Sequence, residues 1–197
     1  MATQLERQHY IREAYLSLEE SAEVKHEYCN GEIRPMTGRT DNHNQLVGSI
    51  YAYLKLALRG QSYRFYINDM RLWIPRYQLY TYPDVMVVAG EPMYERASHT
   101  TIMNPAIIVE VLSKSTHTYD KTDKFRFYRS IPEFQEYILI DQYEFYVEQF
   151  SNTGNGNWLF RDYETADAVL QLTTIAVQVP LRDLYESVDF DLKDTEA

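Results

Sequence analysis

The fold is decided by the stretch from Pro105 to Ile140, PAIIVEVLSKSTHTYDKTDKFRFYRSIPEFQEYILI. Its first part, Ala106 to Leu112, is an apolar run interrupted only by Glu110, which is typical of a strand buried on both faces. The residues from Tyr119 to Arg129 read as a helix that ends before a proline. Because Glu136 to Ile140 is apolar again, the stretch predicts a strand, a crossover helix and a second strand.

Other elements are expected on both sides of this unit. Pro83 and Asp84 precede another apolar run, Val85 to Val88, which predicts a second buried strand. After Asp41, apolar residues recur at spacings of three and four up to a stop at Gly60, which is typical of a long helix. The pair Asn30-Gly31 favours a tight hairpin turn. The remaining predicted elements are a helix over Tyr10–Leu18 and strands over Val24–Tyr28, Glu32–Met36, Tyr63–Ile67, Met70–Ile74, Tyr143–Phe150, Trp158–Tyr163 and Val169–Leu172.

These elements indicate an α+β fold with an α/β-like core, in which helices flank a mixed β-sheet and hairpins lie at its edge. The length of 197 residues suits one domain over residues 1–197, with an acidic end at 189–197 that we expect to fray. The apolar runs are far shorter than the ~20 residues of a membrane span. The first ten residues lack the apolar stretch of a secretion signal, so we expect a cytoplasmic protein.

Cysteine content and charge exclude several classes of protein. Cys29 is the only cysteine, which excludes an internal disulfide and a multi-cysteine zinc site. The net charge of −10 argues against a protein that coats nucleic acid nonspecifically. Two locally basic segments, Lys55–Arg76 and Lys114–Arg129, stand out from this acidic background. Taken alone, each fits a solvated face, and a role in holding phosphate groups would follow only from a nuclease site.

The residue that points to chemistry is Glu110, since an ionised carboxylate inside a core strand needs a positive partner or a metal. Asp84 lies at the start of the neighbouring buried run. If the two strands are adjacent, both carboxylates converge on one site, and their oxygen atoms suit magnesium or manganese.

The following helix offers an amine for the same site. Lys124 has Asp120 one turn earlier on the same helix face, so the lysine is expected to reach the acid pair. Two acids and a lysine around a metal suit phosphodiester cleavage, because the metal activates water and the ammonium group stabilises negative charge. The alternative interpretation is that Asp84 only ends a strand, that Glu110 forms a structural ion pair and that Lys124 lies on a helix surface.

Several short motifs occur in an order that resembles the Uma-type family, a large bacterial family of restriction-endonuclease-like proteins assigned to the PD-(D/E)XK nuclease superfamily. The resemblance covers nearly the whole chain. The motifs that carry it are Glu27-Tyr28, Asn30-Gly31-Glu32, Met36, Thr40, His43, Tyr82-Pro83-Asp84-Val85, Val109-Glu110-Val111-Leu112-Ser113, Ser115-Thr116, Asp120, Lys124, Tyr128 and Glu136-Tyr137.

The resemblance implies a restriction-endonuclease-like fold in which Pro83-Asp84 is the PD element and Glu110 the D/E element. The sequence departs from the usual motif, because Leu112 stands where the lysine is expected. The family pattern supplies that lysine from the next helix and favours Lys124 over its neighbour Lys121. Glu32 matches a further family acid and is a candidate metal ligand, although an exposed hairpin carboxylate fits the position equally well.

The sequence therefore predicts a restriction-type endonuclease that uses Mg²⁺ or Mn²⁺ to hydrolyse DNA, with Asp84, Glu110 and Lys124 as catalytic residues. Asp84, Glu110, the backbone carbonyl of Val111 and Glu32 are the candidate metal ligands, and His43 receives no catalytic role because a lone histidine usually has a structural one. A homodimer is expected, since cutting both strands of a duplex is easiest with two symmetric sites. The alternatives are a binding or regulatory module that keeps a nuclease-like core and, with nothing in its favour, a two-carboxylate glycosidase.

Overall fold

The core of the protein is a six-stranded mixed sheet, seen in the computed structural model, which describes residues 9–36, 38–97 and 99–192. The strand order is β11-β10-β9-β8-β6-β3, and only the pair of β8 and β9 is parallel. The strands are β3 (Tyr63–Ile67), β6 (Val85–Ala89), β8 (Ile107–Leu112), β9 (Glu136–Asp141), β10 (Tyr146–Gly154) and β11 (Asn157–Glu164). The two runs expected to be buried, β6 and β8, are direct neighbours.

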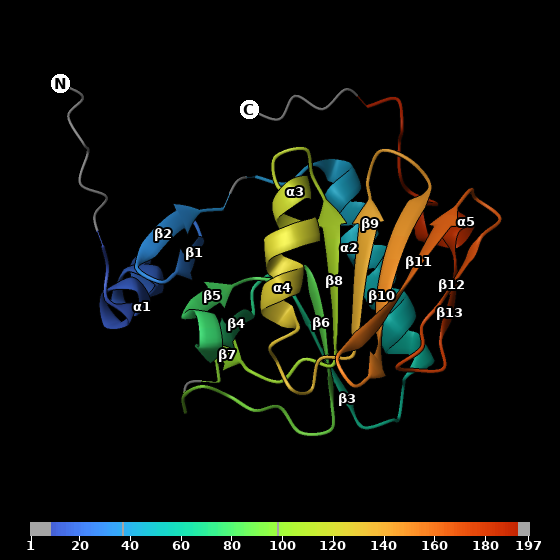
Figure 1. Cartoon of the computed structure of the whole chain (residues 1–197). Coiled ribbons are helices and arrows are strands. Elements are labelled where there is room, and N and C mark those ends of the chain that lie inside the picture. Colours follow the sequence, from blue (N-terminus) through green and yellow to red (C-terminus); the bar gives the residue numbers. More distant parts are fainter. Residues whose placement is uncertain (1–8, 37, 98, 193–197) are drawn as a thin grey trace.

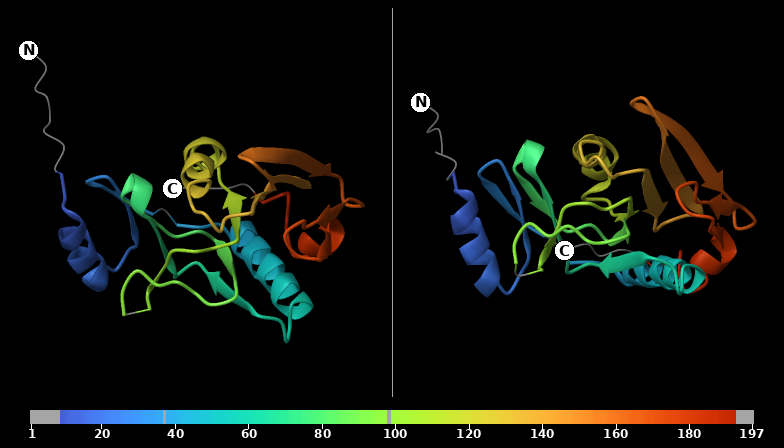
Figure 2. Two further views of the ribbon diagram at one scale, coloured as in Figure 1. Left: turned by 60° about the horizontal axis from the view of Figure 1, so that its bottom comes forward. Right: turned by 90° about the horizontal axis from the view of Figure 1, so that it is seen from below.

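Helices cover both faces of this sheet (Figures 1 and 2). Helix α2 (Asp41–Ala57) packs on one face through Leu46, Ile50 and Leu54, against the odd-numbered side chains of β6 and β8. The crossover helix packs on the other face, against even-numbered side chains such as Met86 and Ile108. It consists of α3 (His117–Tyr119), a π-helical turn (Asp120–Lys124) and α4 (Phe125–Tyr128). The alternation of side chains along the strands thus places Glu110 on the face of the crossover helix.

A second sheet of five short strands, in the order β2-β1-β5-β4-β7, lies beside the first (Figure 1). Its elements are helix α1 (Arg12–Ser21), β1 (His26–Cys29), β2 (Glu32–Pro35), β4 (Arg71–Ile74), a 3-10 turn (Pro75–Tyr77), β5 (Leu79–Thr81) and β7 (Thr101–Ile102). Asn30 and Gly31 form the turn between β1 and β2 with φ angles of 45° and 97°, which is the left-handed conformation that this dipeptide favours. A small hairpin of β12 (Val169–Gln171) and β13 (Gln178–Pro180), followed by α5 (Leu181–Leu184), completes the described chain.

The structure confirms the predicted fold class and corrects several details. The strands fall into two main sheets and a separate two-stranded hairpin rather than one sheet, because the first hairpin pairs with β5 and not with the central strands. The crossover helix begins two residues earlier than predicted and contains a π-helical turn, and the strand expected from Tyr143 begins only at Tyr146. The short elements β5, β7, β13 and α5 were not anticipated.

At the acidic end of the chain, Asp189 is held in place by two hydrogen bonds with Asn42 of α2, while residues 193–197 of the expected frayed segment lie outside the described residues. In the part of the chain that the structure describes, no helix is long and apolar enough to cross a membrane.

Candidate active site

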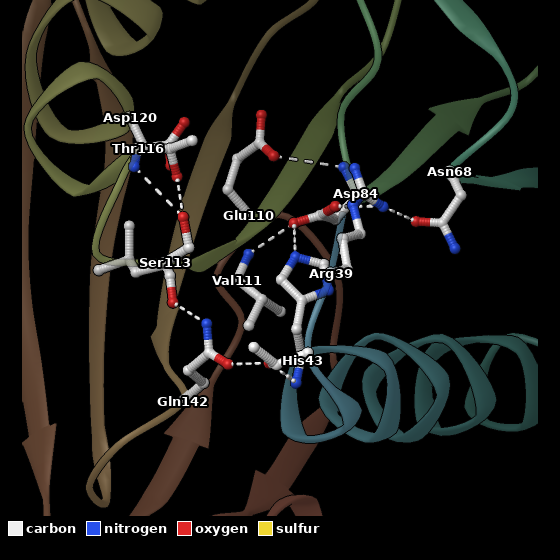
Figure 3. Close-up of polar contacts among 12 residues, drawn as sticks. Arg39, His43, Asn68, Asp84, Glu110, Val111, Ser113, Thr116, Asp120 and Gln142 are labelled. Carbon is white, nitrogen blue, oxygen red and sulfur yellow. Dashed lines mark hydrogen bonds and ion pairs between the residues drawn. The ribbon is translucent and has the colours of Figure 1, made fainter. Parts of the chain in front are cut away.

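Asp84 and Glu110 meet at the junction of β6 and β8 (Figure 3). The antiparallel register pairs Val85 with Val109, which brings the start of β6 next to the last residues of β8. The backbone N–H of Asp84 donates to Glu110 Oε2 at 3.3 Å, and the N–H of Val111 donates to Asp84 Oδ2 at 2.8 Å. Both acids are almost fully buried, with exposures of 2% and 3%. The convergence predicted from the two apolar runs is therefore present.

Lys124 reaches the same pair from the crossover helix. Its Nζ donates to Glu110 Oε1 at 3.0 Å and lies 2.9 Å from Asp120 Oδ1, so the expected face of that helix points at the acids. The hydroxyl of Tyr128 donates to the same Glu110 oxygen at 2.6 Å. Lys121, the rival lysine, instead pairs with Glu148 of β10 at 2.9 Å. Lys124 is buried, so the alternative of a surface helix residue is wrong.

Asp84 is also held from the side of α2. His43, in the first turn of that helix, contacts Asp84 Oδ2 with Nε2 at 3.1 Å, and Arg39 Nη1 lies 2.9 Å from Oδ1. Burial alone would raise the pKa of Asp84, but the hydrogen bond from His43 and the charge of Arg39 outweigh it and lower that pKa below its ordinary value. Asp84 is therefore ionised at neutral pH.

Glu110 has the opposite electrostatic balance. Burial raises its pKa to about 8. The charge of Lys124 opposes this rise, whereas the neighbouring charges of Asp84 and Asp120 reinforce it. For Lys124, burial would lower the pKa, but Asp120, Glu110 and the more distant Glu27 raise it well above its ordinary value, so the amine is charged. The site thus holds two acids with divergent pKa values and a permanent cation.

Asp84, Glu110, Asp120 and Lys124 line a cleft of about 310 Å³. The walls of the cleft come from both sheets and from the crossover helix. From the second sheet and the segment that follows it come Glu27, Arg34 and Arg39. Glu27 Oε1 lies 4.0 Å from Lys124 Nζ and accepts a hydrogen bond from Thr81. Glu32, the candidate ligand of the same hairpin, does not line this cleft and pairs with Arg34 at 2.9 Å.

The two basic segments of the sequence contribute little to the cleft. Of the basic residues in Lys114–Arg129 only Lys124 lines the cleft, and none of those in Lys55–Arg76 does. The other positive side chains of the cleft are Arg34 and Arg39, which lie outside both segments. Sequence charge density was therefore a poor guide to where positive charge gathers in space.

The donor set at this site fits a hard divalent cation. Asp84 Oδ1 and Asp120 Oδ1 are buried, and neither accepts a hydrogen bond within the described residues, since their contacts with Arg39 and Lys124 are ion pairs without hydrogen-bonding geometry. Within residues 9–36, 38–97 and 99–192, no group of three His, Cys, Asp or Glu side chains is placed to hold a metal by itself. Magnesium commonly takes only one or two carboxylates and completes its shell with water and substrate phosphate.

Sequence reasoning gave no site role to three residues that the structure brings to the acids. His43 and Glu27 belong to the quoted motifs, so the signal was present but could not be separated from a structural role. Arg39 lies in the segment between β2 and α2 and carried no local signal. Its placement depends on how the second sheet packs beside the first.

Comparison with known proteins agrees with the resemblance. The model of the Uma2 family, described as "Putative restriction endonuclease", matches residues 12–182. Two proteins of Synechocystis sp., "Uncharacterized protein sll1609" and "Uncharacterized protein slr1290", are 40% and 33% identical to this chain. The matches cover 83% and 90% of this chain and 92% of each relative.

A solved structure shares the fold. It is the crystal structure of "a putative nuclease belonging to DUF820" from Anabaena variabilis, with a TM-score of 0.72 and 16% sequence identity. The match covers 88% of this chain and 96% of that chain. At this level of identity the likeness supports the architecture, while the family assignment rests on the sequence matches.

Proposed function

The chain belongs to the Uma2 family, and from this premise and the geometry of the cleft we propose that it is a metal-dependent endonuclease that hydrolyses DNA phosphodiester bonds. The observation that carries the proposal is the convergence of Asp84, Glu110 and Lys124 at one cleft, where Glu110 accepts hydrogen bonds from the Asp84 N–H at 3.3 Å and from Lys124 Nζ at 3.0 Å. A structural ion pair needs one carboxylate beside the amine, whereas here Asp84 and Asp120 also line the cleft and each has an oxygen that accepts no hydrogen bond from the described residues.

Asp84 and Glu110 would hold the cation, and the backbone carbonyl of Val111 would add a third oxygen. When bound, Mg²⁺ or Mn²⁺ would polarise the phosphate and lower the pKa of water, which turns water into a nucleophile at neutral pH. Asp84 suits this role because it is ionised and keeps Oδ1 free of hydrogen bonds. Glu110 must release its proton before it can serve as a ligand, since its pKa is about 8 in the free protein.

Lys124 would act as an electrostatic group rather than as a base. Its pKa lies well above the ordinary value, so the amine keeps its proton at neutral pH. An ammonium group beside the acid pair is placed to neutralise the negative charge that develops on the phosphate in the transition state. Asp120, 2.9 Å from the amine, holds Lys124 in that position.

The cleft also supplies charge for the DNA backbone. Arg34 and Arg39 line the cleft on the side of the first hairpin, and their guanidinium groups suit phosphate recognition. Because contacts between these guanidinium groups and phosphates are electrostatic, we expect DNA binding to weaken with added salt.

The test is a nicking assay with supercoiled plasmid and Mg²⁺ or Mn²⁺. We expect the wild type to nick the plasmid, and Asp84→Asn and Lys124→Met to lose activity while they keep the fold. Lys121→Met is the matched control, because it removes a lysine of the same helix whose amine pairs with Glu148 outside the cleft. Equal activity in Lys124→Met and Lys121→Met would refute the role of Lys124.

Wild-type protein that binds Mn²⁺ and DNA but never cuts would instead support a binding or regulatory module. A double-strand cut in one event would support the expected homodimer, since each cleft addresses one strand. Analytical ultracentrifugation of the free protein and of its DNA complex measures the oligomeric state directly.

A further inference from the structure

The two oxygens of Asp84 are held by different kinds of contact. Oδ2 accepts hydrogen bonds from the Val111 N–H at 2.8 Å and from His43 Nε2 at 3.1 Å. Oδ1 has only the ion pair with Arg39 and accepts no hydrogen bond from the described residues. Figure 3 shows His43 and Val111 approaching the carboxylate together from one side. One oxygen therefore fixes the orientation of the side chain, and the other has only the ion pair with the partly exposed Arg39.

The backbone of His43 is itself held firmly. His43 is the third residue of α2, and its backbone N–H donates to Oγ1 of the N-cap residue Thr40 at 3.2 Å. Thr40 in turn hydrogen-bonds Gln142, whose amide donates to the carbonyl of Leu112 at 2.7 Å. The start of α2 is thereby tied to β8, the strand that carries Glu110. Movement of His43 relative to the acid pair is restricted by this chain of hydrogen bonds.

The ring makes its only hydrogen bond within the described residues to Asp84. His43 is 5% exposed, and its other ring nitrogen, Nδ1, is buried without a hydrogen-bond partner in the described chain. A histidine kept for packing usually has both ring nitrogens satisfied. Here the single polar contact is directed at a proposed metal ligand, with Nε2 as the donor to the carboxylate.

We propose that His43 is a positioning residue, which locks Asp84 through Oδ2 so that Oδ1 faces the cleft for a divalent cation. This inference rests on the metal site of the proposed function and adds a residue that does not itself contact the ion. Without the Nε2 donor, only the Val111 N–H holds Oδ2, and the carboxylate gains rotational freedom that binding must then remove.

The test compares Mn²⁺ binding by isothermal titration calorimetry in the full-length wild type and in His43→Leu and His43→Gln. We expect His43→Leu to weaken Mn²⁺ binding about 10- to 100-fold, the range typical for loss of a partner that orients a metal ligand. Glutamine can donate to the same oxygen, so His43→Gln should stay within about threefold of the wild type. The nicking rate of His43→Leu should recover at saturating Mn²⁺ more than that of Asp84→Asn.

His26→Leu is the matched control, because His26 also contacts a carboxylate, Glu19, at 3.1 Å but lies outside the cleft. It should leave Mn²⁺ binding unchanged. If His43→Leu does not fold, His43→Asn replaces it, since asparagine is polar but too short to reach Asp84. Equal affinities in the glutamine and leucine or asparagine variants would overturn the inference and leave the proposed function intact, whereas a wild type that binds no Mn²⁺ would overturn both.

Discussion

Two buried glutamates on the neighbouring parallel strands β8 and β9 differ in almost everything except burial. Glu110 is 3% exposed and Glu136 is 0% exposed. The register pairs Glu110 with Leu139 and Ile107 with Glu136, so the two acids lie near opposite ends of the strand pair. They also lie on opposite faces of the sheet, because the partner of Glu110 is Leu139, an odd number of positions (three) along the strand from Glu136.

The partners of Glu136 are all neutral. Its Oε1 accepts hydrogen bonds from the Thr173 N–H at 2.9 Å, from the Thr173 hydroxyl and from Gln149. Its Oε2 accepts from the Thr174 N–H at 2.9 Å. No lysine or arginine of the described chain forms an ion pair with it. Glu136 thus satisfies the backbone of the loop between β12 and β13 and joins that loop to the central sheet.

Glu110 has a cation, a hydroxyl and a backbone N–H as partners, together with the like charges of Asp84 and Asp120. Those like charges and the cleft beside them distinguish a candidate active site from a buried carboxylate that only accepts hydrogen bonds from neutral groups. Burial of an acid is therefore a weak indicator of function, and the balance of its partners is a stronger one.

The largest expected effect is a difference in nicking activity between variants of the two glutamates. Glu110→Gln should lower the rate of Mn²⁺-dependent plasmid nicking by about 1000-fold or more, because it removes a ligand of the cation that supplies several kcal/mol of transition-state stabilisation. Glu136→Gln makes the same chemical change on the next strand and should keep activity within about threefold, since it touches nothing in the cleft. Comparable losses in both variants would contradict the functional distinction between the two acids.

The second expected effect concerns stability, which should fall more in the Glu136 variant than in the Glu110 variant. Glu136→Ala leaves the N–H groups of Thr173 and Thr174 without acceptors and should lower the free energy of unfolding by about 3 kcal/mol. In Glu110→Ala the buried amine of Lys124 keeps Asp120 as a partner at 2.9 Å, so the cost of this variant should be smaller. Urea unfolding without metal measures both values. A larger loss in Glu110→Ala would show that Glu110 is chiefly a structural residue.

A third, smaller effect concerns Arg39, the partly exposed cation beside Asp84. Within the described chain, Glu136 has no such cation beside it. Arg39 lies 2.9 Å from Asp84 Oδ1, the oxygen that the metal would take, and its side chain is 28% exposed. Arg39→Ala should therefore raise the affinity for Mn²⁺ by up to about fivefold, in line with ~1 kcal/mol for a partly exposed ion pair. Arg34→Ala removes a cleft arginine that pairs with Glu32 instead, and should change the affinity less. Weaker binding in Arg39→Ala would mean that Arg39 orders Asp84 rather than competing for it.

The same contrast explains which parts of the site the sequence could predict. Asp84 directly precedes one apolar run and Glu110 lies near the end of another. Because the two strands are adjacent, these positions come together. Lys124 follows from helical spacing, although the π-helical turn around it does not. Glu136 has the same local pattern as Glu110, an acid next to a buried apolar run. The sequence does not reveal that Glu136 accepts hydrogen bonds from a loop far along the chain, whereas Glu110 does not.

The residues that sequence analysis missed share a physical cause. Glu27 and Glu32 lie on the two strands of one hairpin, and which of them reaches the cleft depends on how that hairpin packs against β5. Arg39 is placed by the segment that joins the second sheet to α2. Local patterns specify the elements of the fold, whereas contacts between sheets depend on packing between residues far apart in the sequence.

The last expected effect is a pH dependence that belongs to Glu110. Its pKa is about 8 in the folded protein against 4.5 for an ordinary glutamate, so between these values the folded state binds more protons than the unfolded state. The stabilisation is fully present below pH 4.5 and is lost as the pH rises through 8. Without metal, wild-type protein should lose free energy of unfolding relative to Glu110→Gln between pH 5 and pH 8, with a slope of at most about 1.4 kcal/mol per pH unit.

Mn²⁺ should reverse the sign of this dependence, because the cation binds the ionised carboxylates and its stabilising effect grows as Glu110 loses its proton. Urea unfolding of both proteins at several pH values, with and without Mn²⁺, measures the two slopes. Asp84 does not confuse the comparison, since its lowered pKa keeps it ionised throughout this range in both proteins. Identical slopes in the wild type and in Glu110→Gln would show that Glu110 is already ionised in the free protein, held by Lys124 as an ordinary ion pair, and would remove the electrostatic contrast with Glu136.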